Sequence, residues 1–109
     1  MPWLLRNGEV LASLEIAASR GARRTGLLGR DGIDGAILLT PARSVHSFGM
    51  RFPLDVAWCD RDLTVLRIVH LPRRRMTRSV LRARSVLEAE AGTFTRWNLA
   101  PGDRLELKD

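Results

Sequence analysis

Residues 48–58 read FGMRFPLDVAW, and they carry the clearest structural pattern in the sequence. A large apolar side chain occupies every even position, from Phe48 to Trp58, whereas the odd positions hold Gly, Arg, Pro, Asp and Ala. Side chains on a strand alternate between two faces, so the pattern predicts one strand, bent at Pro53, with its apolar face in the core. The same strand would turn Arg51 and Asp55 toward the opposite face.

Shorter apolar segments on both sides of this stretch predict the rest of the fold. A turn at residues 60–62 leads into LTVLRIVH, residues 63–70, which should pair with the first strand as a hairpin. Further strands are predicted over 9–16, 35–40, 85–89 and 104–107. Short helices are expected over 19–28, capped by Ser19, and after Gly92, with Thr93 as the candidate cap. We therefore predict a mainly β fold, a compact antiparallel sandwich or barrel-like single domain over residues 1–109 with one or two short helices.

Composition excludes several classes of protein. Hydrophobic residues make up 45% and charged residues 28%, which is typical of a globular chain and not of a disordered or fibrous one. No apolar run reaches the ~20 residues of a membrane-spanning helix, and the first residues lack the core of a signal peptide. Cys59 is the single cysteine, so no disulfide can form within the chain. We expect a cytoplasmic protein.

Positive charge is concentrated in one segment. The net charge is +6, and residues 73–84 alone carry six arginines and no acid. One interpretation is a solvated loop in a chain whose composition favours arginine over lysine. The other is a docking surface for an anionic partner, such as nucleic acid, a membrane surface or an acidic protein. On that reading the anion-binding residues are Arg73, Arg74, Arg75 and Arg78.

Four ordered motifs resemble one known family. HSFGMRFPLDV (46–56), RTGLLGR (24–30), VLEAEAG (86–92) and LAPGDRL (99–105) are similar to the motifs of the family called domain of unknown function 192. The resemblance covers residues 9–107 and implies a compact, mostly antiparallel β-sandwich or barrel-like domain with short helices. It implies no activity. Many members carry a signal peptide or lipoprotein signal, which this chain lacks, so the resemblance does not imply an extracytoplasmic role here.

The polar residues of these motifs suggest a ligand-binding cleft. His46 has an unperturbed pKa near neutral, and arginines can hold a carboxylate or phosphate through two hydrogen bonds. The predicted lining is His46, Arg51, Asp55, Arg30 and Glu88. For Asp55 we favour the alternative that its carboxylate caps a nearby turn or pairs with an arginine. His46 alone can likewise be a structural residue.

Other chemistry has weak support in the sequence. No pair of histidines and cysteines has metal-ligand spacing, so we expect neither a metal site nor a cofactor. Cys59 precedes Asp60 and Asp62, whose charges disfavour a thiolate nucleophile. Our first hypothesis is therefore a small-molecule binding module, and the second is docking to an anionic macromolecule. An enzyme of unknown reaction class, with His46 as the base, is the third.

Overall fold

Seven strands form one curled sheet in the computed structural model, which describes residues 2–109. The elements are β1 (Trp3–Arg6), β2 (Glu9–Ala17), α1 (Arg20–Thr25), β3 (Ala36–Leu39), β4 (Leu54–Cys59), β5 (Val65–Leu71), β6 (Ser85–Glu90), α2 (Thr93–Arg96) and β7 (Leu105–Lys108). The strand order is β5-β4-β6-β3-β2-β1-β7. The predicted mainly β fold with short helices is confirmed, and the strands pair antiparallel except for β2 and β3, which are parallel.

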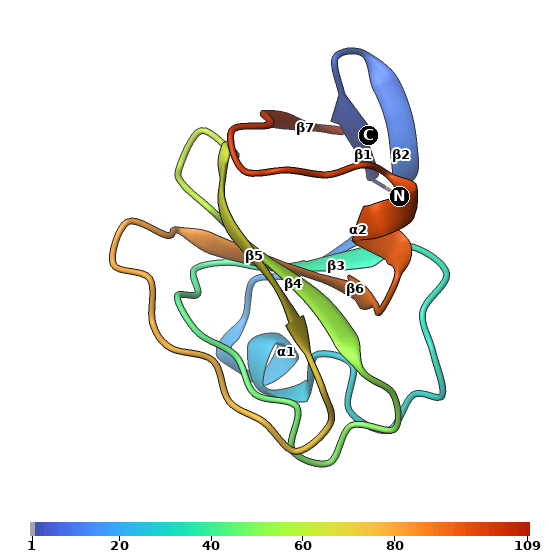
Figure 1. Cartoon of the computed structure of the whole chain (residues 1–109), viewed down its shortest axis with the longest axis vertical. Helices are drawn as coiled ribbons and strands as arrows, with labels where there is room; N and C mark the ends of the chain where they lie inside the picture. Colours follow the sequence, from blue (N-terminus) through green and yellow to red (C-terminus); the bar gives the residue numbers. More distant parts are fainter. Residues whose placement is uncertain (1) are drawn as a thin grey trace.

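The central strands bury side chains on both faces, which separates two hydrophobic clusters. Val56, Trp58 and Val86 belong to the cluster under α1, whereas Ala57 and Leu87 belong to the cluster under β1 and β7. Figure 1 shows β1 and β7 folded over β3, β4 and β6 on one side, with α1 and long loops on the other. Strand β1, which the sequence did not suggest, therefore helps to cover the second face.

The strand that the alternating pattern predicts begins later than expected. Residues 48–53 form a loop, and only Leu54–Cys59 are extended in β4. Gly49 has a φ of +79°, and Pro53 has no N–H to donate to a ladder. The loop still buries Met50 and Phe52 in the core, each 5% exposed, whereas Phe48, which the alternation placed on the same apolar face, is 48% exposed. The predicted hairpin is confirmed, because β4 pairs antiparallel with β5.

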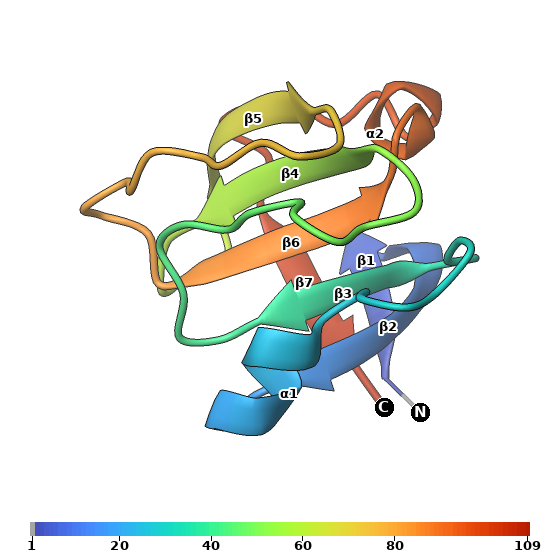
Figure 2. The same cartoon turned by 90° about the horizontal axis from the view of Figure 1, so that it is seen from below.

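The parallel pair β2–β3 requires a crossover, and this connection carries α1. Figure 2 shows α1 lying beside the end of β3, below the sheet. Ser19 accepts a hydrogen bond from Ala22 N, as an N-cap does, but the helix ends at Thr25 and not at Leu28. At the return into β3, Gly35 lies so close to Ser13 that a Cβ would collide with its carbonyl oxygen.

The predicted C-terminal elements are present with two differences. Gly92, with a φ of +95°, is the N-cap of α2, so Thr93 begins the helix and does not cap it. An isolated bridge joins Thr64 to Arg104, before β5 and β7, the two edge strands. These contacts bring the ends of the sheet together without closing it into a barrel.

Candidate functional site

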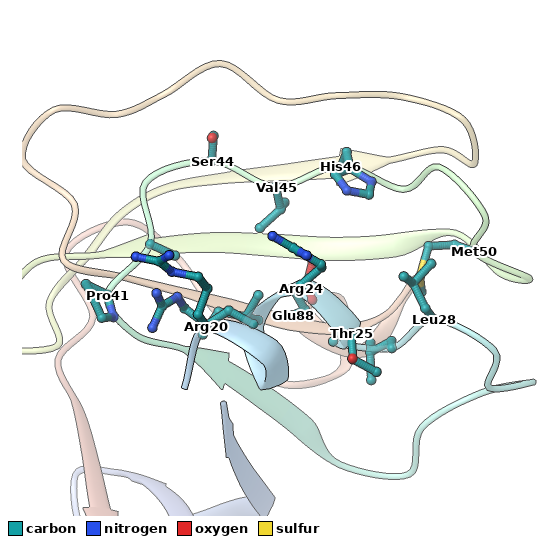
Figure 3. A pocket seen from close by; sticks show the side chains of 15 residues that line it. Arg20, Arg24, Thr25, Leu28, Pro41, Ser44, Val45, His46, Met50 and Glu88 are labelled. Atoms are coloured by element: carbon teal, nitrogen blue, oxygen red, sulfur yellow. The ribbon is translucent and has the colours of Figure 1, made fainter. Parts of the chain in front are cut away.

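A cavity of about 380 Å³ lies between α1, the segment 41–50 and the central sheet. This volume is within the range of small-molecule sites, about 300–1,000 Å³. The residues that line it and carry hydrogen-bonding side chains are Arg20, Arg23, Arg24, Thr25, Ser44, His46 and Glu88. Figure 3 shows that they come from three elements: α1, the segment after β3, and β6. We call it the Glu88 cavity.

Glu88 forms the polar floor of this cavity. Its side chain is 4% exposed, yet it has no hydrogen bond or ion pair among residues 2–109. Its carboxylate lies beneath the turn that ends α1, because a Cβ on Gly26 would be 3.8 Å from Oε1. Burial raises the pKa of Glu88 to about 7, because it removes water from around the charged form. Near neutral pH it can therefore either donate or accept a proton.

Arginines from α1 form the cationic wall of the cavity. Arg23 donates a hydrogen bond to the carbonyl oxygen of Ala18, which fixes its side chain at the base of the helix. Arg20 and Arg24 have no such bond among the described residues, and neither forms an ion pair with an acid. Figure 3 shows both side chains extending from α1 on the side of the cavity that faces Glu88.

His46 lies on the opposite wall. Its Nδ1 accepts a hydrogen bond from the backbone N–H of Phe48 at 3.2 Å, which leaves Nε2 available. The imidazole also stacks on the Phe48 ring, with 5.4 Å between ring centroids. The cavity therefore combines a cationic wall, a carboxyl floor and an imidazole.

Two arginines of the predicted cleft lie outside this cavity and have acidic partners. Arg30 forms two hydrogen bonds of 2.8 Å with Glu15, and this bond is the main reason why the pKa of Glu15 lies below its ordinary value. Arg51 bonds to Asp31 at 2.9 Å in an exposed pair. The five residues of the predicted cleft therefore do not form a single site. Of the five, only His46 and Glu88 meet in the Glu88 cavity.

Asp55 lies on the other face of the sheet. Its Oδ2 accepts hydrogen bonds from the backbone N–H groups of Gly92 and Phe94, at 2.9 and 3.0 Å, at the start of α2. Its Oδ1 lies 3.6 Å from Nδ1 of His70. The arrangement corresponds to the structural alternative for Asp55, because the carboxylate caps a helix from a neighbouring strand.

Residues 72–84, which we call the arginine strap, run alongside residues 43–47. Backbone hydrogen bonds connect Thr77 to Val45 and Val80 to Arg43, and the side chain of Ser47 bonds to Pro72 and Arg75. Arg73 donates a hydrogen bond to the carbonyl oxygen of Met50. The predicted anion-binding residues Arg74, Arg75 and Arg78 are exposed and form no ion pair with the described acids.

Cys59 is buried in the second hydrophobic cluster. Burial, and secondly the charge of Asp60, raises the pKa of its thiol to about 12. This environment opposes a nucleophilic role. Within residues 2–109 no three His, Cys, Asp or Glu side chains come together as a metal site. The same residues contain no helix that is both long and apolar enough to cross a membrane.

The sequence-based prediction missed Arg20 and Arg24. One signal was present, because residues 16–30 contain four arginines and no acid. That signal could not locate the arginines, since their place at the cavity depends on how the crossover packs on the sheet.

Comparisons with known proteins identify a family and two similar structures. The DUF192 family model, described as "Uncharacterized ACR", matches residues 4–107. A crystal structure of a protein of unknown function from Novosphingobium aromaticivorans DSM 12444 is similar with a TM-score of 0.81 and 20% identity, over 96% of this chain and 83% of that one. Another, of a proposed transcription regulator from Sinorhizobium meliloti 1021, has a TM-score of 0.80 and 25% identity over 96% and 90% of the chains. No curated protein matches the chain.

Proposed function

We propose, for a chain that belongs to the DUF192 family, that the Glu88 cavity binds a small organic anion which also carries a hydroxyl or amino group. The anionic group, a carboxylate or phosphate, would contact the arginines of α1. The hydroxyl or amino group would contact Glu88. The protein would then act as a small-molecule binding module.

The observation that carries this proposal is the carboxyl of Glu88, a buried residue that has no hydrogen bond or ion pair among residues 2–109 and whose carboxyl group faces the cavity. Carboxyl oxygens that reach a cavity and have no protein partner are satisfied there by water or by a ligand. Here the side chain is 4% exposed and faces a cavity of about 380 Å³. A ligand donor or acceptor in that cavity would supply the missing partner.

The cationic wall supports an anionic ligand. Arg20 and Arg24 have no acidic partner among the described residues, in contrast to Arg30 and Arg51. A guanidinium can hold a carboxylate or phosphate through two parallel hydrogen bonds. Glu88 is the one acid that lines this cavity, so the wall and the floor select opposite ends of a ligand.

The predicted cleft is thus revised and not abandoned. His46 and Glu88 remain, and Arg20 and Arg24 take the anion-binding role that was predicted for Arg30 and Arg51. His46 would contribute Nε2 as a further polar contact.

A thermal-shift panel tests the proposal. The compounds are inorganic phosphate, sugar phosphates, hydroxy acids and amino acids, with neutral sugars as the uncharged comparison. A true ligand at about 100 times its Kd should raise Tm by on the order of 10 °C. We expect the positive compounds to carry both an anion and a hydroxyl or amino group. A panel in which no anionic compound raises Tm would contradict the proposal.

Two variants locate the binding. Glu88→Met keeps the length of the side chain and removes its polar atoms, and Arg24→Met removes one guanidinium from the wall. Each should weaken binding about tenfold or more, since a hydrogen bond to a charged group contributes about 1.5–3 kcal/mol. Glu90→Met is the matched control, because Glu90 is exposed at the end of the same strand and lies outside the cavity. Equal affinity in all three variants would place the ligand elsewhere and overturn the proposal.

A further inference from the structure

The arginine strap combines charge with exposed aliphatic side chains. Among the large hydrophobic residues described, Leu81 is 81% exposed and Met76 is 69% exposed, the two highest values. Both belong to the strap, where Met76 lies between Arg75 and Arg78 and Leu81 lies between Arg78 and Arg82. Phe48, 48% exposed, lies on the neighbouring segment beside His46, which forms a bridge with Met76.

The backbone of the strap is fixed, although its side chains are exposed. Ser47, which is fully buried, accepts a hydrogen bond from Arg75 N at 2.9 Å and donates one to the carbonyl oxygen of Pro72 at 2.6 Å. Thr77 bonds to Val45 through both its backbone and its side chain. Leu81 and Met76 are therefore held outward on an ordered segment, which lowers the entropic cost of docking.

The charge of this surface is not neutralised by its surroundings. The strap and the segment beside it lie within residues 63–87 and 35–54. Neither of these two ranges contains an acid. The ion pairs of Arg6, Arg30 and Arg51 lie in other parts of the described chain. Figure 1 shows the loop that contains the strap along one side of the molecule, away from α2 and β7.

We propose that the arginine strap docks the protein on an anionic lipid surface, with Leu81 and Met76 entering the interfacial layer. Peripheral membrane proteins combine basic residues, which attract anionic headgroups, with apolar side chains that enter the boundary of the acyl chains. Such docking needs no membrane-spanning helix. The proposal concerns a different surface from the Glu88 cavity and does not depend on a ligand there.

The side-chain chemistry favours lipid over single-stranded nucleic acid. Proteins that bind single strands place aromatic rings against the bases. Residues 72–84 contain no aromatic residue, and the rings beside them, Phe48 and His46, are stacked on each other. Exposed Leu and Met side chains gain little from a phosphate backbone, but they gain apolar burial at a bilayer. The aliphatic side chains therefore decide between the two partners.

The experiment is co-sedimentation of the full chain with phosphatidylcholine vesicles that either contain or lack phosphatidylglycerol. We expect binding only to the anionic vesicles, weakening as salt is raised. Replacing Arg74, Arg75 and Arg78 by Gln should weaken it by roughly 100-fold, at about fivefold per arginine. Replacing Arg61, Arg96 and Arg104 by Gln is the matched control, since it removes the same charge from exposed positions outside the strap.

A second pair of variants tests insertion. Leu81→Ser combined with Met76→Ser should weaken vesicle binding about tenfold or more, because two apolar side chains leave the interface. Val10→Ser, at a position that is 58% exposed on β2, should leave binding unchanged. A single-stranded RNA oligonucleotide is measured in parallel, since RNA binding would respond to the arginine variant but not to the Leu81 and Met76 variant.

Three outcomes would overturn the proposal. The first is binding to RNA with no binding to anionic vesicles. The second is vesicle binding that the Leu81 and Met76 variant does not alter, which would indicate a purely electrostatic association. The third is self-association of the chain in solution that Leu81→Ser abolishes, which would show that a second copy covers these side chains.

Discussion

Asp55 and Glu88 are buried acids on adjacent strands, but they lie on opposite faces of the sheet and differ in their hydrogen-bond partners. Asp55 projects from β4 toward α2, where two backbone N–H groups bond to its carboxylate. Glu88 projects from β6 into the cavity under α1, where it has no partner among the described residues. Their exposed fractions are 7% and 4%.

The contrast shows that burial alone does not distinguish a structural acid from a candidate binding residue. The hydrogen-bond and ion-pair partners of the carboxylate distinguish the two. The carboxylate of Asp55 satisfies the free N–H groups of a helix that begins at Gly92, whose residue type offers no side-chain cap. The carboxyl of Glu88 satisfies no backbone or side-chain group among residues 2–109. Asp55 therefore caps a helix, whereas Glu88 is the residue on which the proposed ligand site rests, and three predictions test this division.

The largest effect is expected at Asp55. Asp55→Ala should lower the free energy of unfolding by about 4 kcal/mol, because it leaves two N–H groups without an acceptor, each costing about 1–3 kcal/mol. Urea denaturation measures the change. Asp55→Asn keeps an acceptor oxygen and should cost about 1 kcal/mol. If Asp55→Ala lowered the free energy of unfolding by less than about 1 kcal/mol, packing and not the carboxylate would account for the stability of α2.

The pH dependence of stability tests Glu88. Its pKa is raised by burial from 4.5 to about 7, so between these pH values the unfolded chain releases a proton that the folded chain keeps. Stability should therefore fall by about 3 kcal/mol as pH rises from 4.5 to 7, and this contribution should be constant above and below that range. Urea denaturation of the wild type and Glu88→Gln isolates this decline, which the variant lacks. A pH-independent difference would show that water solvates the carboxyl in the cavity.

The smallest effect is expected for an acid that is partnered but exposed. The side chains of Arg30 and Glu15 are 39% and 45% exposed, and two hydrogen bonds join them. Arg30→Gln should cost less than about 1 kcal/mol, since solvent and salt screen such pairs. Denaturation at low and high salt measures this contribution. A cost similar to that of Asp55→Ala would show that the hydrogen bonds of an acid stabilise the fold equally whether the acid is buried or exposed.

The sequence predicted the fold where local pattern and burial agree. The apolar alternation of residues 54–58 correctly identified the central strand and its hairpin with residues 65–71. The same alternation was wrong for residues 48–53, because a loop shaped by Gly49 and Pro53 can bury Met50 and Phe52 without forming a strand, while Phe48 stays 48% exposed. The face of Asp55 is buried because β1 and β7 cover it, and the short β1 carried too little pattern to be recognised.

The candidate site was only half predictable, for a physical reason. His46 and Glu88 belong to recognisable motifs, and the fold brings them to one cavity. Arg30 and Arg51 belong to those motifs too, but they pair with Glu15 and Asp31, at sequence separations of 15 and 20 residues. Pairing of this kind depends on tertiary geometry, which composition and spacing along the chain do not encode.

The parallel pairing of β2 and β3 has an evolutionary consequence. It obliges residues 18–35 to cross over the sheet, so one wall of the Glu88 cavity belongs to a connection and not to a strand. Connections of this kind tolerate changes in length and sequence at small cost in folding free energy, whereas strands do not. Selectivity for a ligand can therefore diverge in this segment while the register of all seven strands is retained.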